Sequence, residues 1–582
     1  MTRSLRIAAA SWGSPLLLIV AFGILLTLPL LVHGFWPYTW DARLHINWSI
    51  NFSRQFWAGE LYPRWLSGMN EGLGSPVFFY YPPTPYWVTS FLQPLTGNDP
   101  LGWRPLAWSC CLGLILSGVS CFVWLRRLTP QWPALTAALL YMLMPYHLRT
   151  DLYVRGAFAE FWSFAWMPLI LHAVHRVSAK ERFALPYLGF AYALLITTHL
   201  PTTLIFSLVP VAYACLVNWS GQSAWPVVRT AAGMALGIGL ASIYLIPAMT
   251  MQGHASMQEL TTFLYYSKSF FLAEFDWRTR SLGDVFKTQM FWVMLATVAA
   301  GCCSLLLVLR SSARHLRRQA CFWLVVMLMA YFMMFTISDP VWRLVSAIQI
   351  IQFPWRFGAV LCVAVAALMA LAMASLSRPL RWPQLALLQG GYTTVIVWIF
   401  LTVVALWPTF FYPKESRLTA RASTVDPPEY RPFWVQTNRD QVIEKYASSP
   451  LATNRVVFSQ GTGSVSVMAW EPRNIRLQVT ASTNATLQFH RFFYAGWEAY
   501  SGSAQIHVSP THPEGLLSTT LPAGQHDLVL VMKATKPEAA ARSLSAAAVL
   551  LWLCLLGLEL WPSKTSKPLP NTAIDSQPAC PA

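Results

Sequence analysis

Asp41 is the residue whose type and position best suit catalysis. It lies just beyond the first long apolar segment, at the end of an aromatic stretch (36–40), and His45 follows four residues later. Residues at i and i+4 share one face of a helix, and aromatic surroundings that remove water raise the basicity of a carboxylate. This pattern predicts a general base, or a pair of side chains that orients an acceptor hydroxyl. The alternative is that Asp41 caps a helix beginning near Ala42.

Residues 61–83 combine glycines, many aromatic rings and one basic side chain. Arg64, Tyr80 and Tyr81 are the members that can bind a polar ligand. A sugar stacks its C–H faces on aromatic rings, while its hydroxyls need fixed hydrogen-bond partners. The stretch therefore predicts a sugar-binding site. The alternative is an aromatic belt at the membrane surface.

A group of charged residues lies between two apolar segments, at residues 146–160. It contains Asp151, Arg155 and Glu160. Arg155 can bind a phosphate with two hydrogen bonds, whereas Glu160 enters an apolar run where it must find a partner. The group predicts phosphate binding by Arg155. A structural ion pair between Arg155 and Glu160 is the alternative.

Two further candidates lie at later breaks between apolar segments. His199 is a candidate ligand-binding residue, although a packed interfacial histidine is the alternative. Gln352 and Arg356 precede an apolar run, where Arg356 can neutralise a lipid phosphate. Extension of the Arg356 side chain to the membrane surface is the alternative.

Several familiar sequence motifs are missing in any suitable context, among them the Walker loop, GxGxxG, HExxH and GxSxG. Their absence argues against ATP-driven transport by this chain. The ten cysteines form no CxxC and no Cys/His ligand spacing. We accordingly predict no cofactor, and the sequence does not support a divalent metal site.

The composition indicates a membrane protein. Hydrophobic residues make up 55% of the 582 positions and charged residues only 11%, against about a quarter charged in soluble proteins. The net charge of +17 comes from short basic clusters between apolar segments. Such clusters fit membrane topology better than a nucleic-acid-binding surface, so we predict membrane lipids and no nucleic acid as partners.

About twelve segments are long and apolar enough to span a bilayer. They are residues 14–32, 104–125, 131–146, 158–174, 184–199, 202–218, 228–250, 288–309, 320–337, 357–376, 384–408 and 543–561. Basic residues gather in alternate loops, which predicts both termini in the cytoplasm. Long loops at 33–103 and 251–287 then face outward.

The chain changes character between the last two predicted spans. Residues 409–542 carry short alternating runs, such as 475–479, 486–489 and 527–531, separated by turn signals. They predict a periplasmic β-sandwich-like domain between the transmembrane domain (1–408) and the last helix (543–561). The tail, 562–582, is predicted to be disordered. Within the first loop, residues 44–57 predict an amphipathic helix in the membrane interface.

Taken together, these segments resemble the YfhO-like bacterial membrane proteins, and especially the group labelled 6-pyruvoyl-tetrahydropterin synthase-related. The label implies no pterin chemistry. The resemblance rests on Asp41 with His45 and on five further segments, at residues 59–65, 72–83, 155–160, 352–356 and 493–500.

The resemblance implies the GT-C fold of membrane glycosyltransferases, which take sugars from polyprenyl-phosphate carriers on the outer face. Asp41 would correspond to the catalytic acidic residue of the first outer loop. His45 stands where that family's loop often has a second acid. This departure puts metal dependence in doubt.

These observations predict a glycosyltransferase of the bacterial inner membrane. It would move a sugar from a polyprenyl-phosphate carrier to an envelope glycan or lipid acceptor, with Asp41 as base and Trp497 of the β domain helping to bind the acceptor. One rival is a transporter or flippase of lipid-linked glycans, but the ionisable residues lie at the outer ends of the spans and no two-half repeat is evident. The other is a non-catalytic envelope-assembly protein.

Overall fold

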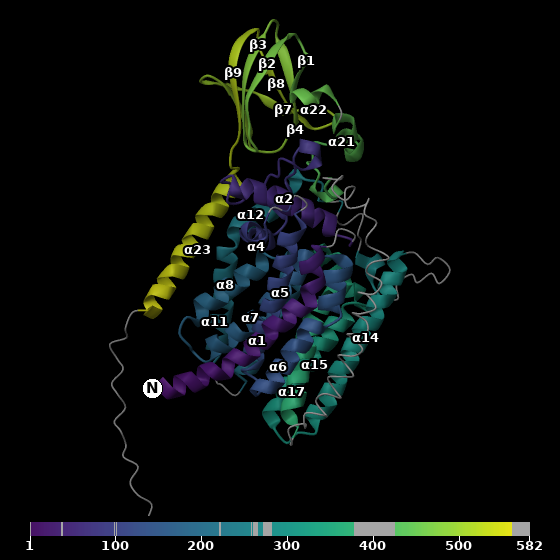
Figure 1. Cartoon of the computed structure of the whole chain (residues 1–582), viewed down its shortest axis with the longest axis vertical. Helices are drawn as coiled ribbons and strands as arrows, with labels where there is room; N and C mark the ends of the chain where they lie inside the picture. Colours follow the sequence, from purple (N-terminus) through teal and green to yellow (C-terminus); the bar gives the residue numbers. More distant parts are fainter. Residues whose placement is uncertain are drawn as a thin grey trace, which may run out of the picture.

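The computed structural model describes residues 2–35, 39–97, 99, 102–219, 223–257, 259, 266–271, 282–376, 425–447 and 449–560. The predicted span at 384–408, part of the loop at 251–287 and the tail at 562–582 lie outside these residues. In the described part, a bundle of helices carries a β domain at one end (Figure 1). We call this end of the bundle the β-domain end. Helix α1 begins toward the opposite end, and α23 runs from the β-domain end along the outside of the bundle (Figure 1).

The long helices of the bundle follow the apolar segments of the sequence. Helix α5 packs against α1, α6 and α7, and α17 packs against α6, α14 and α15. Helix α17 is rich in alanine and contains no charged residue, so its neighbours approach closely on every side. The bounds are α1 (Thr2–His33), α5 (Trp103–Leu125), α6 (Gln131–Leu143), α7 (Phe158–Ser178), α8 (Ala184–Ile196), α9 (Leu200–Phe206), α10 (Leu208–Val217), α11 (Trp225–Leu240), α12 (Ser242–Thr250), α14 (Leu282–Leu309), α15 (Arg314–Phe332), α17 (Gly358–Ser375) and α23 (Lys536–Leu560).

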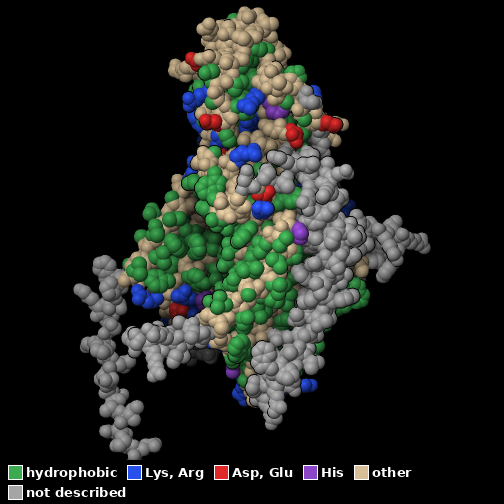
Figure 2. Space-filling view, viewed as in Figure 1, with side chains coloured by type: hydrophobic (Ala, Val, Ile, Leu, Met, Phe, Trp, Pro, Cys, Tyr) green, Lys and Arg blue, Asp and Glu red, His purple; other side chains and the backbone are tan. Residues whose placement is uncertain are grey.

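Six stretches of these helices are long and apolar enough to cross a membrane, with α9 and α10 counted together. The pair α11 and α12 makes a seventh if its 73° bend lies within one span. Helices α6 and α8 have 13 residues each, fewer than the roughly 20 that a bilayer requires. Twelve spans therefore remains a prediction. Hydrophobic side chains cover the middle of the bundle, and Lys and Arg lie at its lower end (Figure 2).

The segment predicted as one continuous span at 228–250 is instead broken at Ala241. The first backbone groups of α12 then need partners from outside the helix. The hydroxyl of Ser545, in α23, accepts a hydrogen bond from the Ile243 N–H at 2.7 Å. A contact from the far end of the chain thus compensates for the break.

The β domain consists of two antiparallel sheets, with strand orders β1-β4-β8-β7 and β2-β3-β9-β5-β6. The runs at 475–479, 486–489 and 527–531 form β3, β4 and β9, as predicted. Helix α23 begins at Lys536, before the predicted boundary at 543. The strands are β1 (Val456–Gln460), β2 (Gly463–Trp470), β3 (Asn474–Ala481), β4 (Ala485–Phe492), β5 (Trp497–Ser501), β6 (Ala504–Ile506), β7 (Val508–Pro510), β8 (Leu516–Leu521) and β9 (Gly524–Met532).

The long first loop lies between the bundle and the β domain. It contains α2 (Ala42–Trp57), which crosses the β-domain end (Figure 1), and α4 (Thr84–Leu92). The Leu73 carbonyl accepts the Phe492 N–H at 2.7 Å, and Glu60 pairs with Arg473 at 2.8 Å. The β domain is therefore fixed to the loop through both main-chain and charged contacts.

Candidate active site at the β-domain end

Asp41 directly precedes α2, but its side chain makes no hydrogen bond that caps this helix. Its main-chain N–H donates to the Arg155 carbonyl at 2.9 Å. Within the described residues, the half-buried carboxylate has no hydrogen-bond or ion-pair partner of its own. Burial raises the pKa of Asp41, while the charges of Arg155 and Arg356 oppose that rise. The site therefore offers an available carboxylate whose basicity is increased.

His45 lies one turn beyond Asp41 on α2, and its ring is directed to a different partner. The Nδ1 atom is 2.6 Å from the Tyr86 hydroxyl, and the ring is buried. Burial, reinforced by the charge of Arg155, lowers the pKa of His45 to about 3. The imidazole is thus neutral at physiological pH. It is suited to orienting neighbouring groups, whereas the Asp41 carboxylate has the chemistry to accept a proton.

Glu160 joins two arginines that come from distant parts of the chain. Its Oε2 atom lies 2.8 Å from Nη1 of Arg155 and 3.1 Å from Nε of Arg356, while its Oε1 accepts the Tyr146 hydroxyl. Arg155 also pairs with Asp151 at 2.8 Å. The Arg155–Glu160 ion pair considered from the sequence is therefore present, and it includes Arg356 as a third member.

Both arginines keep N–H groups that are not donated to any residue the structure describes. Arg155 engages its two carboxylates through Nη1 alone. Arg356 donates from Nη1 to the Ile351 carbonyl at 2.6 Å and to Oε1 of Gln352 at 3.3 Å. Among the described residues, Nη2 of each arginine has no partner, and the Arg356 side chain is 11% exposed. These donors suit an anionic oxygen such as that of a phosphate.

An unusual backbone brings Arg155 beside Asp41. Residues 146–155 form a ten-residue π-helix, a conformation that is rare and frequent at functional sites. It ends at Gly156, whose φ is +63°. A Cβ at this position would lie 2.2 Å from the Thr39 hydroxyl, so only glycine allows the segment before Asp41 to approach the end of the π-helix this closely.

Aromatic rings surround His45 on several sides. Trp48 and Tyr81 have ring centroids 4.8 Å apart, and Tyr86 and Phe158 are at 5.7 Å. Tyr430, which precedes the β domain, lies 5.7 Å from Trp48. We call Trp48, Tyr81, Tyr86, Phe158 and Tyr430 the aromatic cluster. The Trp48 indole N–H also donates to Asp426 at 2.6 Å.

The structure brings together nine of the twelve predicted site residues. The nine are Asp41, His45, Tyr81, Asp151, Arg155, Glu160, His199, Gln352 and Arg356. His199 belongs to this group through its electrostatic interaction with Glu160, and its Nδ1 atom is 2.7 Å from the Thr202 hydroxyl.

The other three predicted residues make contacts elsewhere. Arg64 forms a buried ion pair with Glu538 of α23 at 2.9 Å. The Tyr80 hydroxyl donates to the Met251 carbonyl at 2.7 Å and is 2.8 Å from the Tyr494 hydroxyl. Trp497 is only 6% exposed in the β-domain core. These contacts join the first loop to other parts of the molecule or fill the core, and sugar or acceptor binding by these residues stays a prediction.

Residues of the site that lay outside the sequence prediction include Trp48, Tyr86, Phe158, Asp426 and Tyr430. Trp48 was visible only as one member of an amphipathic face. Asp426 and Tyr430 belong to the segment predicted as the β domain, where no pattern singles them out. In the described part of the chain, no group of three or more His, Cys, Asp or Glu residues is arranged to hold a metal ion.

Comparison with known proteins assigns the chain to a family. A family model described as "6-pyruvoyl-tetrahydropterin synthase related domain; membrane protein" matches residues 78–412. This match covers more than half of the chain, and it begins after Asp41 and includes Arg155, Glu160 and Arg356. A search of curated proteins found no match.

Several solved structures share a remote likeness with the chain. Arabinofuranosyltransferase AftD from Mycobacteria is 15% identical, with a TM-score of 0.42 over 71% of this chain and 27% of that protein. An oligosaccharyltransferase from Archaeoglobus fulgidus is 12% identical, with a TM-score of 0.30 over 76% of this chain and 56% of that one. ArnT from Cupriavidus metallidurans is 14% identical, with a TM-score of 0.26 over 63% and 78%. The chain thus spans about a quarter of the length of AftD.

Proposed function

The chain belongs to the 6-pyruvoyl-tetrahydropterin synthase-related family of membrane proteins, and we propose that it is a membrane glycosyltransferase. It would move a sugar from a polyprenyl-phosphate carrier to an envelope glycan or lipid on the periplasmic face of a bacterial inner membrane. One observation supports this proposal above the others. Among the described residues, the Asp41 carboxylate has no partner and lies beside two arginines that keep free N–H donors. Such a transfer needs this pairing of a base with phosphate-binding cations.

In the proposed reaction, the oxygen of an acceptor hydroxyl attacks the anomeric carbon of the sugar. Asp41 accepts the proton of this hydroxyl as the attack proceeds. The new C–O bond forms while the bond between that carbon and the carrier phosphate breaks. The electron pair of the broken bond leaves with the polyprenyl phosphate, and the configuration at the anomeric carbon inverts. Arg356 and Arg155 offset the charge that develops on the phosphate, and fixed cations of this kind favour the transition state.

The remaining residues of the site position these groups. Glu160 fixes both arginines through one carboxylate oxygen. The neutral His45 ring orients Tyr86, and the aromatic cluster offers faces on which a sugar can stack. Exclusion of water by these rings strengthens the electrostatic interactions among the charged groups.

The alternative is a flippase for lipid-linked glycans, and the bent pair α11 and α12 favours it, because broken helices are common in transporters. Transfer and flipping can be separated directly. The purified protein in lipid vesicles is incubated with a radiolabelled polyprenyl-phosphate sugar and envelope glycan acceptors. We expect label to appear on the acceptor. Movement of the labelled lipid across the bilayer without transfer would favour the flippase instead.

The rate of transfer is expected to fall at acidic pH, and the midpoint of this fall should lie above the usual pKa of aspartate. Only ionised Asp41 accepts a proton, and burial raises its pKa, so kcat rises as pH increases through that raised value and then levels off. His45 adds no limb near pH 6.5, because its pKa is about 3. Initial rates between pH 4 and pH 8 test this. A limb at the ordinary aspartate pKa of about 3.9 would contradict it.

Arg356→Lys is expected to lower kcat by roughly 10²-fold, by analogy with the loss of one prepositioned donor at an oxyanion site. Lysine keeps the charge but cannot donate to Glu160 and a phosphate oxygen from one planar group. Steady-state kinetics with varied lipid-linked sugar measures the change. Arg343→Lys is the matched control, because Arg343 pairs with Asp339 and its side chain is 74% exposed. If kcat is the same in both variants, Arg356 does not stabilise the transition state of transfer.

A further inference from the structure

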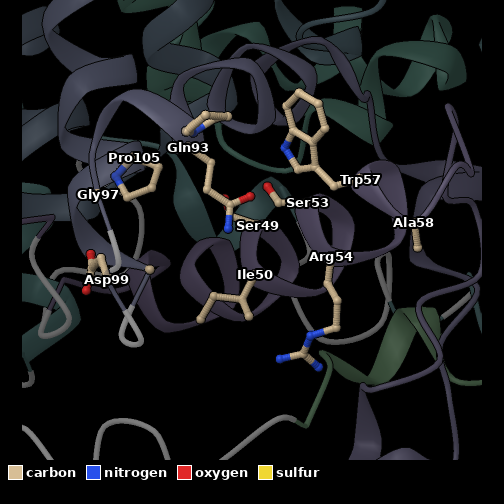
Figure 3. Close-up of a pocket in the computed structure, with 12 residues that line it drawn as sticks. Ser49, Ile50, Ser53, Arg54, Trp57, Ala58, Gln93, Gly97, Asp99 and Pro105 are labelled. Atoms are coloured by element: carbon tan, nitrogen blue, oxygen red, sulfur yellow. The ribbon is translucent and has the colours of Figure 1, made fainter.

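A cavity lies along α2, away from the residues around Asp41. It has a volume of about 900 Å³ and is bounded by α2, the segment after α4 and the start of α5 (Figure 3). This volume is within the range of ordinary small-molecule sites. Trp48 of α2 belongs to the aromatic cluster and His45 contacts it, whereas Ser49, Ser53 and Trp57 line the cavity.

Trp57 forms a fixed aromatic wall of this cavity. Its indole N–H donates to the Ser90 carbonyl at 3.0 Å, and its ring meets the Phe56 ring edge to face at 5.3 Å. Despite these restraints, 54% of Trp57 is exposed. A rigid, exposed indole costs little conformational entropy when a ligand stacks on it.

The polar groups of the cavity are neutral and, in part, unused. Within the described residues, the side chains of Ser49 and Gln93 have no hydrogen-bond partner, and the Ser53 hydroxyl is 2.8 Å from that of Ser90. Figure 3 shows the Gln93 amide pointing toward Ser53. Hydroxyls and an amide both donate and accept hydrogen bonds, as the hydroxyls of a sugar require.

The charges at the cavity do not select an anion. Arg54 and Asp99 both line it and have opposite signs. Figure 3 shows the Arg54 side chain directed away from Gln93. An anionic phospholipid headgroup would need a net positive lining to neutralise its phosphate, whereas a neutral ligand needs no net charge in the lining. The lining therefore favours a neutral sugar over an anionic lipid headgroup.

We infer that this cavity binds a neutral pyranose unit of the glycan acceptor, stacked on Trp57 and hydrogen-bonded by Ser49 and Gln93. The identification of the sugar as part of the acceptor rests on the proposed function. At 1.5 Å per residue, Ser53 lies about 18 Å along α2 from Asp41. An acceptor that fills the cavity and reaches Asp41 is therefore an oligosaccharide, with its reacting end at Asp41 and a more distant unit at Trp57.

Saturation-transfer NMR with the full chain in nanodiscs tests the inference. The probes are the methyl glycosides of glucose, galactose and mannose, each titrated alone. We expect saturable transfer to ring protons of at least one glycoside. The signal should fall at least five-fold in Trp57→Ala and in Gln93→Ala, and it should persist in Trp132→Ala, which removes another exposed tryptophan. Gel filtration establishes that each variant is monodisperse.

The outcomes separate this inference from the proposed function. No saturable signal with any glycoside, an undiminished signal in Trp57→Ala, or displacement of the glycoside by glycerol 3-phosphate would overturn it, and the last result would identify a lipid-headgroup site. Binding is also measured in Asp41→Asn, where it should be unchanged. A protein that binds the glycoside through Trp57 but transfers no sugar would leave the carbohydrate site in place and refute the glycosyltransferase.

Discussion

Replacing Asp41 with asparagine is expected to lower kcat for sugar transfer by about 10²–10⁴-fold, the usual contribution of a general base. Asparagine has nearly the same shape but cannot accept the proton. The Asp41 side chain makes no hydrogen bond that caps α2, so the substitution removes no structural contact that the described residues show. The measurement is initial-rate transfer from a radiolabelled polyprenyl-phosphate sugar.

The matched control is Asp527→Asn. Asp527 is exposed on β9 of the β domain, so this variant loses the same charge far from the site and should retain full activity. Thermal unfolding of both variants is expected to match that of the parent protein within about 0.5 kcal/mol. Transfer at the parental rate by a folded Asp41→Asn protein would exclude Asp41 as the base.

Glu160→Gln is expected to destabilise the protein by about 3–5 kcal/mol, the usual effect of removing one member of a buried ion pair. Glu160 is 1% exposed and is the carboxylate shared by Arg155 and Arg356. Glutamine keeps the size and one acceptor oxygen, but it removes the carboxylate charge that pairs with Arg356 and leaves Arg155 with Asp151 alone. Unfolding in detergent, followed by circular dichroism, measures the loss.

Glu181→Gln provides the comparison for this prediction. Glu181 also bridges two arginines, Arg127 and Arg176, but its side chain is 32% exposed. Ion pairs open to solvent contribute at most about 1 kcal/mol, so this variant should unfold close to the parent protein. Equal destabilisation by the two substitutions would show that burial does not set the strength of the Glu160 network.

The sequence was sufficient to predict the elements whose pattern is local. The strands at 475–479, 486–489 and 527–531 form because alternation in a sheet has a period of two residues. The helix expected at 44–57 is found at Ala42–Trp57. Local spacing also brought Arg155 and Glu160 within reach of one another, since both lie around the end of one helix and the start of the next.

Features that depend on distant contacts could not be predicted in this way. The spacing of Asp41 and His45 suggested a pair, yet His45 contacts Tyr86, 41 residues away, because α4 packs beside α2. The Trp48 to Asp426 hydrogen bond joins residues 378 positions apart. The π-helix at 146–155 has no established periodic signal, and the break at Ala241 depends on Ser545 of α23.

The position of Tyr430 in the chain has a consequence for the synthesis of the protein. Tyr430 and Asp426 contact Trp48, so the aromatic cluster cannot be complete until roughly 380 further residues have left the ribosome. At about 5–20 residues per second, this interval lasts about 20–80 s. During that time the nascent chain already holds Asp41 but lacks part of the site around it. The aromatic cluster thus forms only after the segment leading into the β domain has been synthesised, while α23 (Lys536–Leu560) has still to follow.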